Sequence, residues 1–242
     1  MFQYELKPLL ECTIKHRVNR FVVLVEVNGT PRRARITNTG RLLELLVEGK
    51  KGYCIWKKTP KTDCILVGVD VGLEDKAALI DTKIQEEVFY HAAKKGVFKW
   101  LKNCDIIKRY PLFENSRFDF MVKCGASLGF IEMKSAVLLF DEIYAGYPDC
   151  KSDRGRRHIE KLMKLKERGF RSIIVFAAAH PMAKAFKPYG EGDPLMPLLL
   201  RKAREAGVEI YAFKLALLPS RNLVEIEAVS YTHLTLPTTE RV

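Results

Sequence analysis

The chain has 242 residues, of which 48% are hydrophobic, so it can bury one large core or two modest ones without disulfides or metals to hold it together. Its 41 Lys and Arg residues outnumber its 29 Asp and Glu residues, which gives a formal charge of +12. This excess favours a polyanionic partner, nucleic acid first, because each phosphate contact releases counterions. A solvated basic surface with no such partner explains the charge equally well.

The sequence carries no sign of a secreted or membrane protein. No basic region followed by an apolar run opens the chain, and no apolar stretch is long enough to cross a bilayer. The six cysteines form no Cys-x-x-Cys pair and have no histidine at zinc-like spacing, so we expect reduced, mostly buried thiols in a cytoplasmic protein. Residues 229–242 continue no earlier pattern and resemble a vector-derived tail, so they are left out of the predicted fold.

Residues 1–75 have the pattern of a small β-barrel. The segment RFVVLVEV leads through Asn28-Gly29 into RRARI, which predicts a β-hairpin. A short amphipathic stretch, RLLELL, predicts one helix, and the β-rich runs KGYCIWKKT and DCILVGVDV follow it. Strands, a short helix and further strands fit a barrel of the oligonucleotide-binding (OB) type.

Such barrels bind single strands on a basic face that carries aromatic groups. The residues that could form this face are Arg32, Arg33, Arg35, Arg41, Tyr53, Trp56, Lys57 and Lys58. The alternative is equally open for each of them: the aromatic residues belong to the barrel core and the arginines to a solvated edge.

Residues 76–228 change to an alternating α/β pattern. DTKIQEEVFYHAAKKGVF has apolar residues at helical spacing and predicts a long helix. Strand-like segments IIKRYPLF, RFDFMVK and GFIEMKS follow, then a helix over about 154–168 and the strand RSIIVFAAA. The helix PLLLRKAREAGV and the strand EIYAFKLALL complete the series. This order predicts a three-layer α/β domain with a mixed sheet.

Two neighbouring strands place acidic and basic groups where a core is expected. Strand alternation puts Phe118, Phe120 and Val122 on one face and Asp119 on the other, while Glu132 and Lys134 share a face. The glycine-containing linker between the strands predicts an antiparallel hairpin. If Asp119 pairs with residue 132 or 134, the three polar groups meet on one face, whereas pairing with residue 133 would separate them.

Two carboxylates beside one amine suit phosphodiester cleavage. Asp119 and Glu132 could hold Mg²⁺ or Mn²⁺ through oxygen atoms, and Lys134 could orient the attacking water or neutralise developing charge. An isolated Glu-x-Lys on a strand is more often a surface ion pair. The Asp119 strand directly before it favours the catalytic interpretation.

Five segments resemble the sugar fermentation stimulation protein A (SfsA) family in order and spacing: TNTGRLLELL, NSRFDF, IEMKS, YPDCKSDRGRRHIEKL and AGVEIYAF. The resemblance covers nearly the whole chain apart from residues 229–242. It implies an N-terminal OB-like barrel and a C-terminal domain of the PD-(D/E)xK nuclease type, in DNA-binding proteins linked to regulation of sugar-utilisation genes. By position it makes Asp119 and Glu132 metal ligands and Lys134 the catalytic amine.

Other candidates for the site have open alternatives. Nucleases of this type often take another acid from the first helix, for which Glu86 and Glu87 are candidates, although that segment matches the family poorly. Asp149 is either a site residue or the cap of the next helix. Arg154 and His158 lie four residues apart and could reach a phosphate together, or they could pair with acids on the surface of their own helix.

Two functions follow from these patterns. The first is an Mg²⁺- or Mn²⁺-dependent nuclease that acts on DNA or RNA, with the barrel holding the strand. The second is a non-catalytic DNA-binding regulator of sugar-utilisation genes that keeps the nuclease fold. Neither requires a membrane or a small-molecule cofactor, and the sequence offers no support for a sugar-active enzyme.

Overall fold

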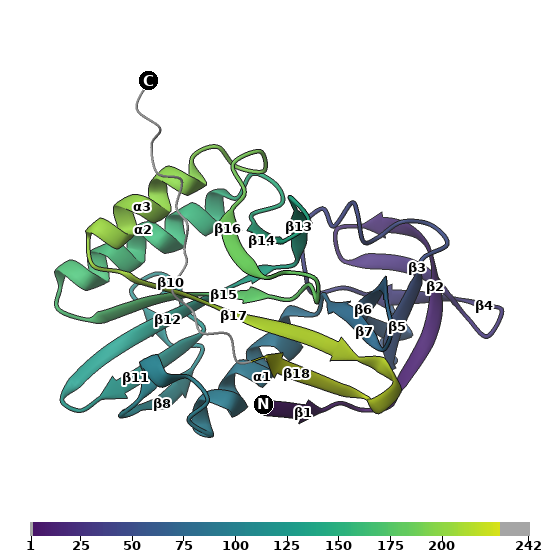
Figure 1. The fold of residues 1–242 in the computed structure, drawn as a ribbon, viewed down its shortest axis with the longest axis horizontal. Coiled ribbons are helices and arrows are strands. Elements are labelled where there is room, and N and C mark those ends of the chain that lie inside the picture. The colour runs from purple at the N-terminus through teal and green to yellow at the C-terminus, as the bar shows by residue number, and fades with distance from the viewer. Residues whose placement is uncertain (1, 228–242) are drawn as a thin grey trace.

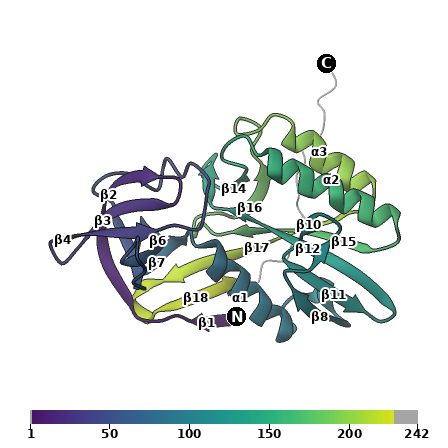
Figure 2. The same ribbon diagram turned by 180° about the vertical axis from the view of Figure 1, so that it is seen from behind.

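The computed structural model describes residues 2–227, so the predicted tail at 229–242 lies outside the described residues. Figures 1 and 2 show a barrel at one end and a helix-covered sheet at the other. The helices are α1 (Thr82–Lys94), α2 (Asp153–Glu167) and α3 (Met196–Glu205), with short 3₁₀ turns at Lys99–Leu101 and Pro219–Arg221. The strands are β1 (Phe2–Glu5), β2 (Leu9–Asn19), β3 (Val22–Val27), β4 (Thr30–Arg35), β5 (Lys51–Trp56), β6 (Cys64–Leu73), β7 (Lys76–Leu79), β8 (Cys104–Arg109), β9 (Leu112–Phe113), β10 (Ser116–Arg117), β11 (Phe120–Cys124), β12 (Ser127–Ala136), β13 (Leu138–Phe140), β14 (Tyr144–Tyr147), β15 (Arg171–Ala178), β16 (Ala185–Pro188), β17 (Glu209–Leu218) and β18 (Leu223–Glu227).

The N-terminal strands form the predicted OB-type barrel. Strand β2 pairs with β3 and β5, β3 pairs with β4, and β5 pairs with β6, all antiparallel. A parallel contact between β4 and β6 closes the ring. The β3–β4 turn has Asn28 and Gly29 at positive φ, as the sequence pattern predicts.

The predicted helix over RLLELL is wrong. Among the described residues this stretch forms only a turn, in which the N–H groups of Leu45 and Leu46 both donate to the Leu42 carbonyl. Leu42 has a positive φ of 52°, outside the right-handed helical region, and its N–H donates to Asp149 of the other half of the chain. A helix of only six residues is too weakly stable to form when the contact between Leu42 and Asp149 favours another backbone conformation. The amphipathic pattern instead buries Leu42 and Leu45 in the core.

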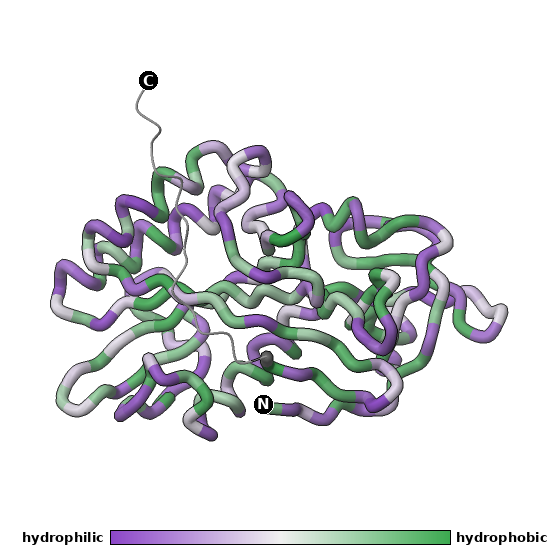
Figure 3. Tube along the Cα trace, in the orientation of Figure 1, coloured by the Kyte–Doolittle hydropathy of each residue, from purple (hydrophilic) through white to green (hydrophobic). Residues whose placement is uncertain are grey.

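The C-terminal half has the predicted three-layer α/β arrangement with a mixed sheet. Strands β12, β15 and β17 are parallel, and β11 and β8 extend the sheet antiparallel on one side. Alternate residues of these strands face two different cores: Ile173 and Val175 pack with α1, while Ile174 and Phe176 pack with α2 and α3. In Figure 3 these strands are largely coloured as hydrophobic, whereas the helices alternate between hydrophilic and hydrophobic residues.

The barrel and the α/β half share one sheet and one core. Strand β7 follows β6 of the barrel and pairs with β17, so the path of strands continues from one half into the other. Strand β1 pairs with β18 at the other end of the sequence. Gly68 lies where a Cβ atom would be 2.3 Å from Leu217 Cδ2, so any larger residue there would have to displace the Leu217 side chain. No helix in the described part of the chain is long and apolar enough to span a membrane.

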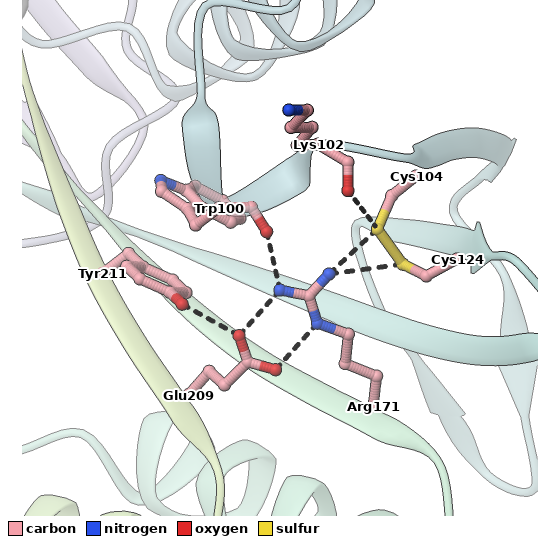
Figure 4. Close-up of a disulfide and its surroundings, with 7 residues drawn as sticks. All are labelled: Trp100, Lys102, Cys104, Cys124, Arg171, Glu209 and Tyr211. Atoms are coloured by element: carbon pink, nitrogen blue, oxygen red, sulfur yellow. Dashed lines mark hydrogen bonds and ion pairs between the residues drawn. A yellow bond between two sulfur atoms is a disulfide. The ribbon is translucent and has the colours of Figure 1, made fainter.

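The expectation that every cysteine is a free thiol is wrong. Cys104 and Cys124 form a disulfide between β8 and β11, where they face each other in the strand register (Figure 4). Arg171 donates toward both sulfur atoms and forms an ion pair with Glu209. A separation of 20 residues gives no local signal, because only the sheet register brings the two thiols together.

We predict that alkylation of the unfolded, unreduced protein labels four of its six cysteines. Cys104 and Cys124 should become reactive only after reduction, and replacing both by serine should lower the free energy of unfolding by about 3 kcal/mol, the value for a loop of this length. Peptide mass spectrometry and denaturant unfolding measure these effects. Six labelled cysteines without reductant would contradict the prediction.

His180 follows β15 and is buried in neutral form. Burial, with the positive charges of Lys50 and Lys214, lowers the pKa of His180 to about 4. Its Nδ1 accepts a hydrogen bond from the Met182 N–H at 3.3 Å. Between pH 6.5 and 4 the unfolded histidine takes up a proton that the folded one does not, so stability is complete above this range and falls as the pH drops through it.

The gap between the folded and unfolded pKa values of His180 corresponds to about 3 kcal/mol of acid-dependent destabilisation. We therefore expect His180→Gln to make the melting temperature less dependent on pH between 6.5 and 4. The exposed His16 gives the matched control, since His16→Gln should keep the wild-type slope. Circular dichroism measures the melting temperatures. If melting temperature changed equally with pH in wild type and in His180→Gln, the titration of His180 would not affect stability.

Candidate active site

Asp119 lies opposite Glu132, as the catalytic interpretation requires. The antiparallel register of β11 and β12 pairs Phe120 with Ile131, and the bend just before β11 brings the Asp119 carboxylate close enough to Glu132 for their charges to interact. The Met133 N–H donates to Asp119 Oδ2 at 2.7 Å and fixes the carboxylate. The hairpin and its register are thus those in which the three polar groups meet.

One predicted neighbour of Asp119 lies elsewhere. Phe118 packs with Phe130 in the core beneath α2, whereas Phe120 and Val122 pack in the core beneath α1. The shared face predicted for these three residues is therefore wrong. A bend at Asp119 separates β10 from β11 and breaks the alternation on which that prediction depends.

Glu132, Lys134 and His158 form a buried charged cluster. Lys134 Nζ donates to Glu132 Oε1 at 2.6 Å, and His158 Nδ1 of α2 contacts the same oxygen. The side chains of Glu132, Lys134 and His158 are only 5%, 11% and 12% exposed. The Glu-x-Lys pair is therefore not a surface ion pair, and His158 pairs with Glu132 instead of with an acid of its own helix.

Burial and charge move the pKa values of this cluster in different directions. Burial, together with the charges of Glu132 and Glu86, raises the pKa of Asp119 to about 8. Burial also acts to raise the pKa of Glu132, but the charge of Lys134 and the contact with His158 hold it below its usual range. Burial acts to lower the pKa of Lys134, and the charge of Glu132 raises it above its usual value. Asp119 resists ionisation because it is buried beside Glu132 and Glu86. Such a site favours an additional cation, because a positive charge would stabilise the ionised carboxylates.

Of the two acids considered on α1, Glu86 lines the same cavity and Glu87 does not. Glu86 is buried and accepts hydrogen bonds from the Tyr110 hydroxyl at 2.7 Å and from Lys83 Nζ. Glu87 instead forms a paired contact with Arg109, with nitrogen–oxygen distances of 2.5 and 3.0 Å. The helix thus contributes one acid to the site and uses the other to hold strand β8.

Asp149 does not cap the helix that follows it. Ser152 caps α2 through the Gly155 N–H, while Asp149 Oδ2 accepts a hydrogen bond from the Leu42 N–H at 2.9 Å. The backbone comes so close to Asp149 that a Cβ atom at Gly40 would be 2.4 Å from its carboxylate. The cap of α2 thus lies three residues later than the sequence indicated. Asp149 itself lines the cavity and joins the two halves of the chain.

A cavity of about 740 Å³ encloses the acidic cluster and is lined by both halves of the chain. The barrel contributes the β2–β3 turn and residues 37–40, and the α/β half contributes α1, β12 and the start of α2. Thr37 Oγ1 accepts a hydrogen bond from the Thr82 N–H, and Asn38 Nδ2 donates to Ser135 Oγ. Residues 37–40 are therefore fixed to both α1 and β12 of the α/β half. The same cavity is also lined by five basic side chains: Arg20, Lys83, Arg117, Lys151 and Arg154.

The remaining predicted basic residues lie on the barrel, outside the wall of this cavity. Arg32 lies over the ring of Trp56 at 5.5 Å, and Trp56 is 48% exposed. Tyr53 is buried and belongs to the barrel core. Arg33, Arg35, Lys57 and Lys58 are exposed, and Arg41 lines a smaller neighbouring cavity with Asp149.

Sequence reasoning missed several residues of the cavity. The sequence patterns place Arg20 and Phe21 only in a strand, give Arg117 no role, and mark residues 37–40 only by their resemblance to the family. Their side chains converge through the tertiary structure, and neither spacing nor periodicity along the chain could reveal that convergence. The run of polar residues Thr37-Asn38-Thr39, between Ile36 and the leucine-rich segment RLLELL, is the one available signal.

The donor set fits a divalent cation that is also held by water or substrate. Glu132 Oε2 is buried and has no hydrogen-bond partner among the described residues, although Glu132 Oε1 has two. No three His, Cys, Asp or Glu side chains of residues 2–227 form a complete ligand group. Magnesium is commonly bound by one or two carboxylates with waters and substrate phosphates, and Asp119 with Glu132 matches that arrangement.

Comparisons with known proteins match both halves of the chain. Residues 16–80 match the family model described as the SfsA N-terminal OB domain, and residues 83–221 match the sugar fermentation stimulation protein RE domain. A Pyrococcus furiosus sugar fermentation stimulation protein homolog is 47% identical over 211 residues, covering 87% of this chain and 90% of its own. An Archaeoglobus fulgidus homolog is 40% identical over 201 residues, covering 83% of this chain and 86% of its own.

A solved structure resembles the chain over nearly its full length. It is titled the structure of Pyrococcus furiosus SfsA in complex with Ca²⁺, and it superposes with a TM-score of 0.87 at 44% identity. The match covers 93% of this chain and 95% of the solved one.

Proposed function

The chain belongs to the sugar fermentation stimulation protein family, and on this basis and its acidic centre we propose that it is a nucleic-acid-binding protein that hydrolyses phosphodiester bonds with Mg²⁺ or Mn²⁺. One observation carries the proposal: Asp119 and Glu132 face each other beside the buried amine of Lys134, inside a cavity with a basic rim.

A divalent cation at Asp119 and Glu132 is supported by chemistry and by similarity. The buried Glu132 Oε2 lacks a hydrogen-bond partner among the described residues, and a cation would satisfy it. The similar Pyrococcus furiosus structure is titled as a complex with Ca²⁺, which also binds through oxygen ligands. Lys134 and His158 keep the Glu132 carboxylate ionised although it is buried, whereas burial raises the pKa of Asp119, so Glu132 can bind a cation without first losing a proton.

Each residue of the centre has a distinct role in the proposed reaction. The bound cation would supply a nucleophilic water at neutral pH and stabilise negative charge on the phosphate. Lys134 holds a fixed positive charge 2.6 Å from Glu132, where it can orient water and neutralise charge on the transferring group. His158 contacts the same Glu132 oxygen as Lys134 and helps to hold that carboxylate in place, and Glu86 adds a further negative charge near Asp119.

Binding of the strand is proposed for the basic surfaces of the barrel and the cavity rim. Strand β4 carries exposed Arg33 and Arg35 and leads directly into residues 37–40 of the cavity wall. The Arg32–Trp56 pair offers a cation and an exposed ring, the combination on which unpaired bases stack. The formal charge of +12 adds a salt-dependent attraction for any polyanion.

Incubation with labelled single-stranded DNA, duplex DNA and RNA tests the proposal, with Mg²⁺ or Mn²⁺ and separately with a chelator. We expect salt-sensitive binding and metal-dependent cleavage that the chelator abolishes. Binding without cleavage under either metal would leave only a DNA-binding role, and absence of both would refute the proposal.

A further inference from the structure

The turn between β2 and β3 presents an aromatic ring to the cavity that encloses Asp119 and Glu132. Phe21 lines this cavity and is 55% exposed. The guanidinium carbon of Arg20 lies 6.0 Å from the centre of the Phe21 ring. Single exposed apolar residues are common on protein surfaces, but among the exposed large apolar residues of the described part of the chain only Phe21 lines this cavity.

The backbone of this turn is held rigidly. Arg17 donates to the Arg20 carbonyl at 2.9 Å, Asn19 Oδ1 accepts from the Phe21 N–H at 2.8 Å, and the Ile36 N–H donates to the Phe21 carbonyl at 2.9 Å. The same Arg17 side chain donates to the Gly40 carbonyl of the cavity wall. The ring therefore sits on a preorganised support, so binding a ligand there requires little further ordering of the turn.

The rest of the cavity defines the chemistry of that ligand. Arg117, Lys151 and Arg154 line it and can bind phosphate, while the acidic centre requires a ligand that brings a cation with it. A flat, apolar surface amid phosphate-binding groups fits a nucleobase attached to its backbone. An apolar peptide would leave these cations without partners.

We propose that Phe21, flanked by Arg20, is a stacking platform for an unpaired nucleobase next to the phosphodiester held at Asp119 and Glu132. The platform rests on the proposed nuclease function and specifies its substrate class: single-stranded nucleic acid or a strand with an unpaired segment at the site. Inside a duplex both faces of each base are covered by its neighbours, so away from the duplex ends only an unstacked base can offer a face to Phe21.

Fluorescence anisotropy tests the platform with two probes, a fluorescein-labelled oligothymidylate and a blunt duplex of the same length. Titrations in Ca²⁺ at one salt concentration compare wild type with Phe21→Ala and Phe21→Trp, and gels check that the probes stay intact. Leu198→Ala is the matched control, because Leu198 is an exposed apolar residue on α3, which does not line the cavity. Melting curves verify that all variants are folded.

We expect Phe21→Ala to weaken single-strand binding about tenfold and to leave duplex binding unchanged. Phe21→Trp should retain single-strand binding, and Leu198→Ala should match wild type. Equal single-strand binding by wild type and Phe21→Ala would overturn the platform while nucleic-acid binding stands. An equal loss for both probes would also overturn it, since the effect would not depend on unpaired bases. If wild type binds neither probe, the proposed function fails and the platform fails with it.

Discussion

Glu132→Gln is expected to abolish divalent-cation binding and to reduce metal-dependent cleavage by at least about 100-fold. The substitution keeps the size of the side chain but removes the charge from Oε2, the buried oxygen that has no hydrogen-bond partner among the described residues. It also leaves the Lys134 ammonium buried without its carboxylate, so some loss of stability should accompany the loss of activity. Calorimetric titration with Mn²⁺ and a cleavage assay measure the two effects.

Lys134→Met separates cation binding from catalysis. Lys134 provides no oxygen ligand, so this variant should still bind Mn²⁺ but should lose about 100-fold or more in cleavage. Glu132→Gln and Lys134→Met should therefore differ in calorimetry, where only Lys134→Met binds Mn²⁺, and should both show reduced cleavage. Normal cleavage by either variant would refute the roles assigned to these residues.

Asp193→Ala is expected to have the second large effect, on stability, with a loss of about 3 kcal/mol in the free energy of unfolding. The Asp193 side chain is only 1% exposed and accepts two 2.6 Å contacts from Arg156 Nη1. Asp193 also accepts a hydrogen bond from the Ser152 N–H, so it fixes the N-terminus of α2, the helix that carries His158. Urea unfolding monitored by circular dichroism measures the loss.

Asp153→Ala provides a matched control for Asp193→Ala, because Asp153 pairs with the same Arg156 from a side chain that is 61% exposed. An exposed pair contributes little, so the control should cost less than about 1 kcal/mol. Equal losses in the two variants would show that burial of Asp193 does not determine the strength of this contact.

Sequence patterns predicted most of the fold because its signals are local. The Asn28-Gly29 hairpin, the apolar periodicity of α1 and the alternation in β12 each depend on neighbouring residues and survive in the structure. The hairpin register required by Asp119 and Glu132 could be stated as a condition, since parity alone limits the choices.

Other features depend on contacts between distant parts of the chain and could not be predicted. The Cys104–Cys124 disulfide follows from the pairing of β8 with β11, and the turn at Leu42 follows from its contact with Asp149. Phe21 reaches the site only because the barrel packs against the α/β half. The sequence periodicity within each half does not predict how the two halves pack together.

The most direct test of the acidic centre is anomalous scattering from a crystal of the protein soaked in Mn²⁺. The proposed site predicts a peak at coordination distance from carboxylate oxygens of both Asp119 and Glu132, and no peak there in Glu132→Gln. A wild-type crystal with Mn²⁺ bound elsewhere and none between these carboxylates would contradict the proposal of a metal-dependent site.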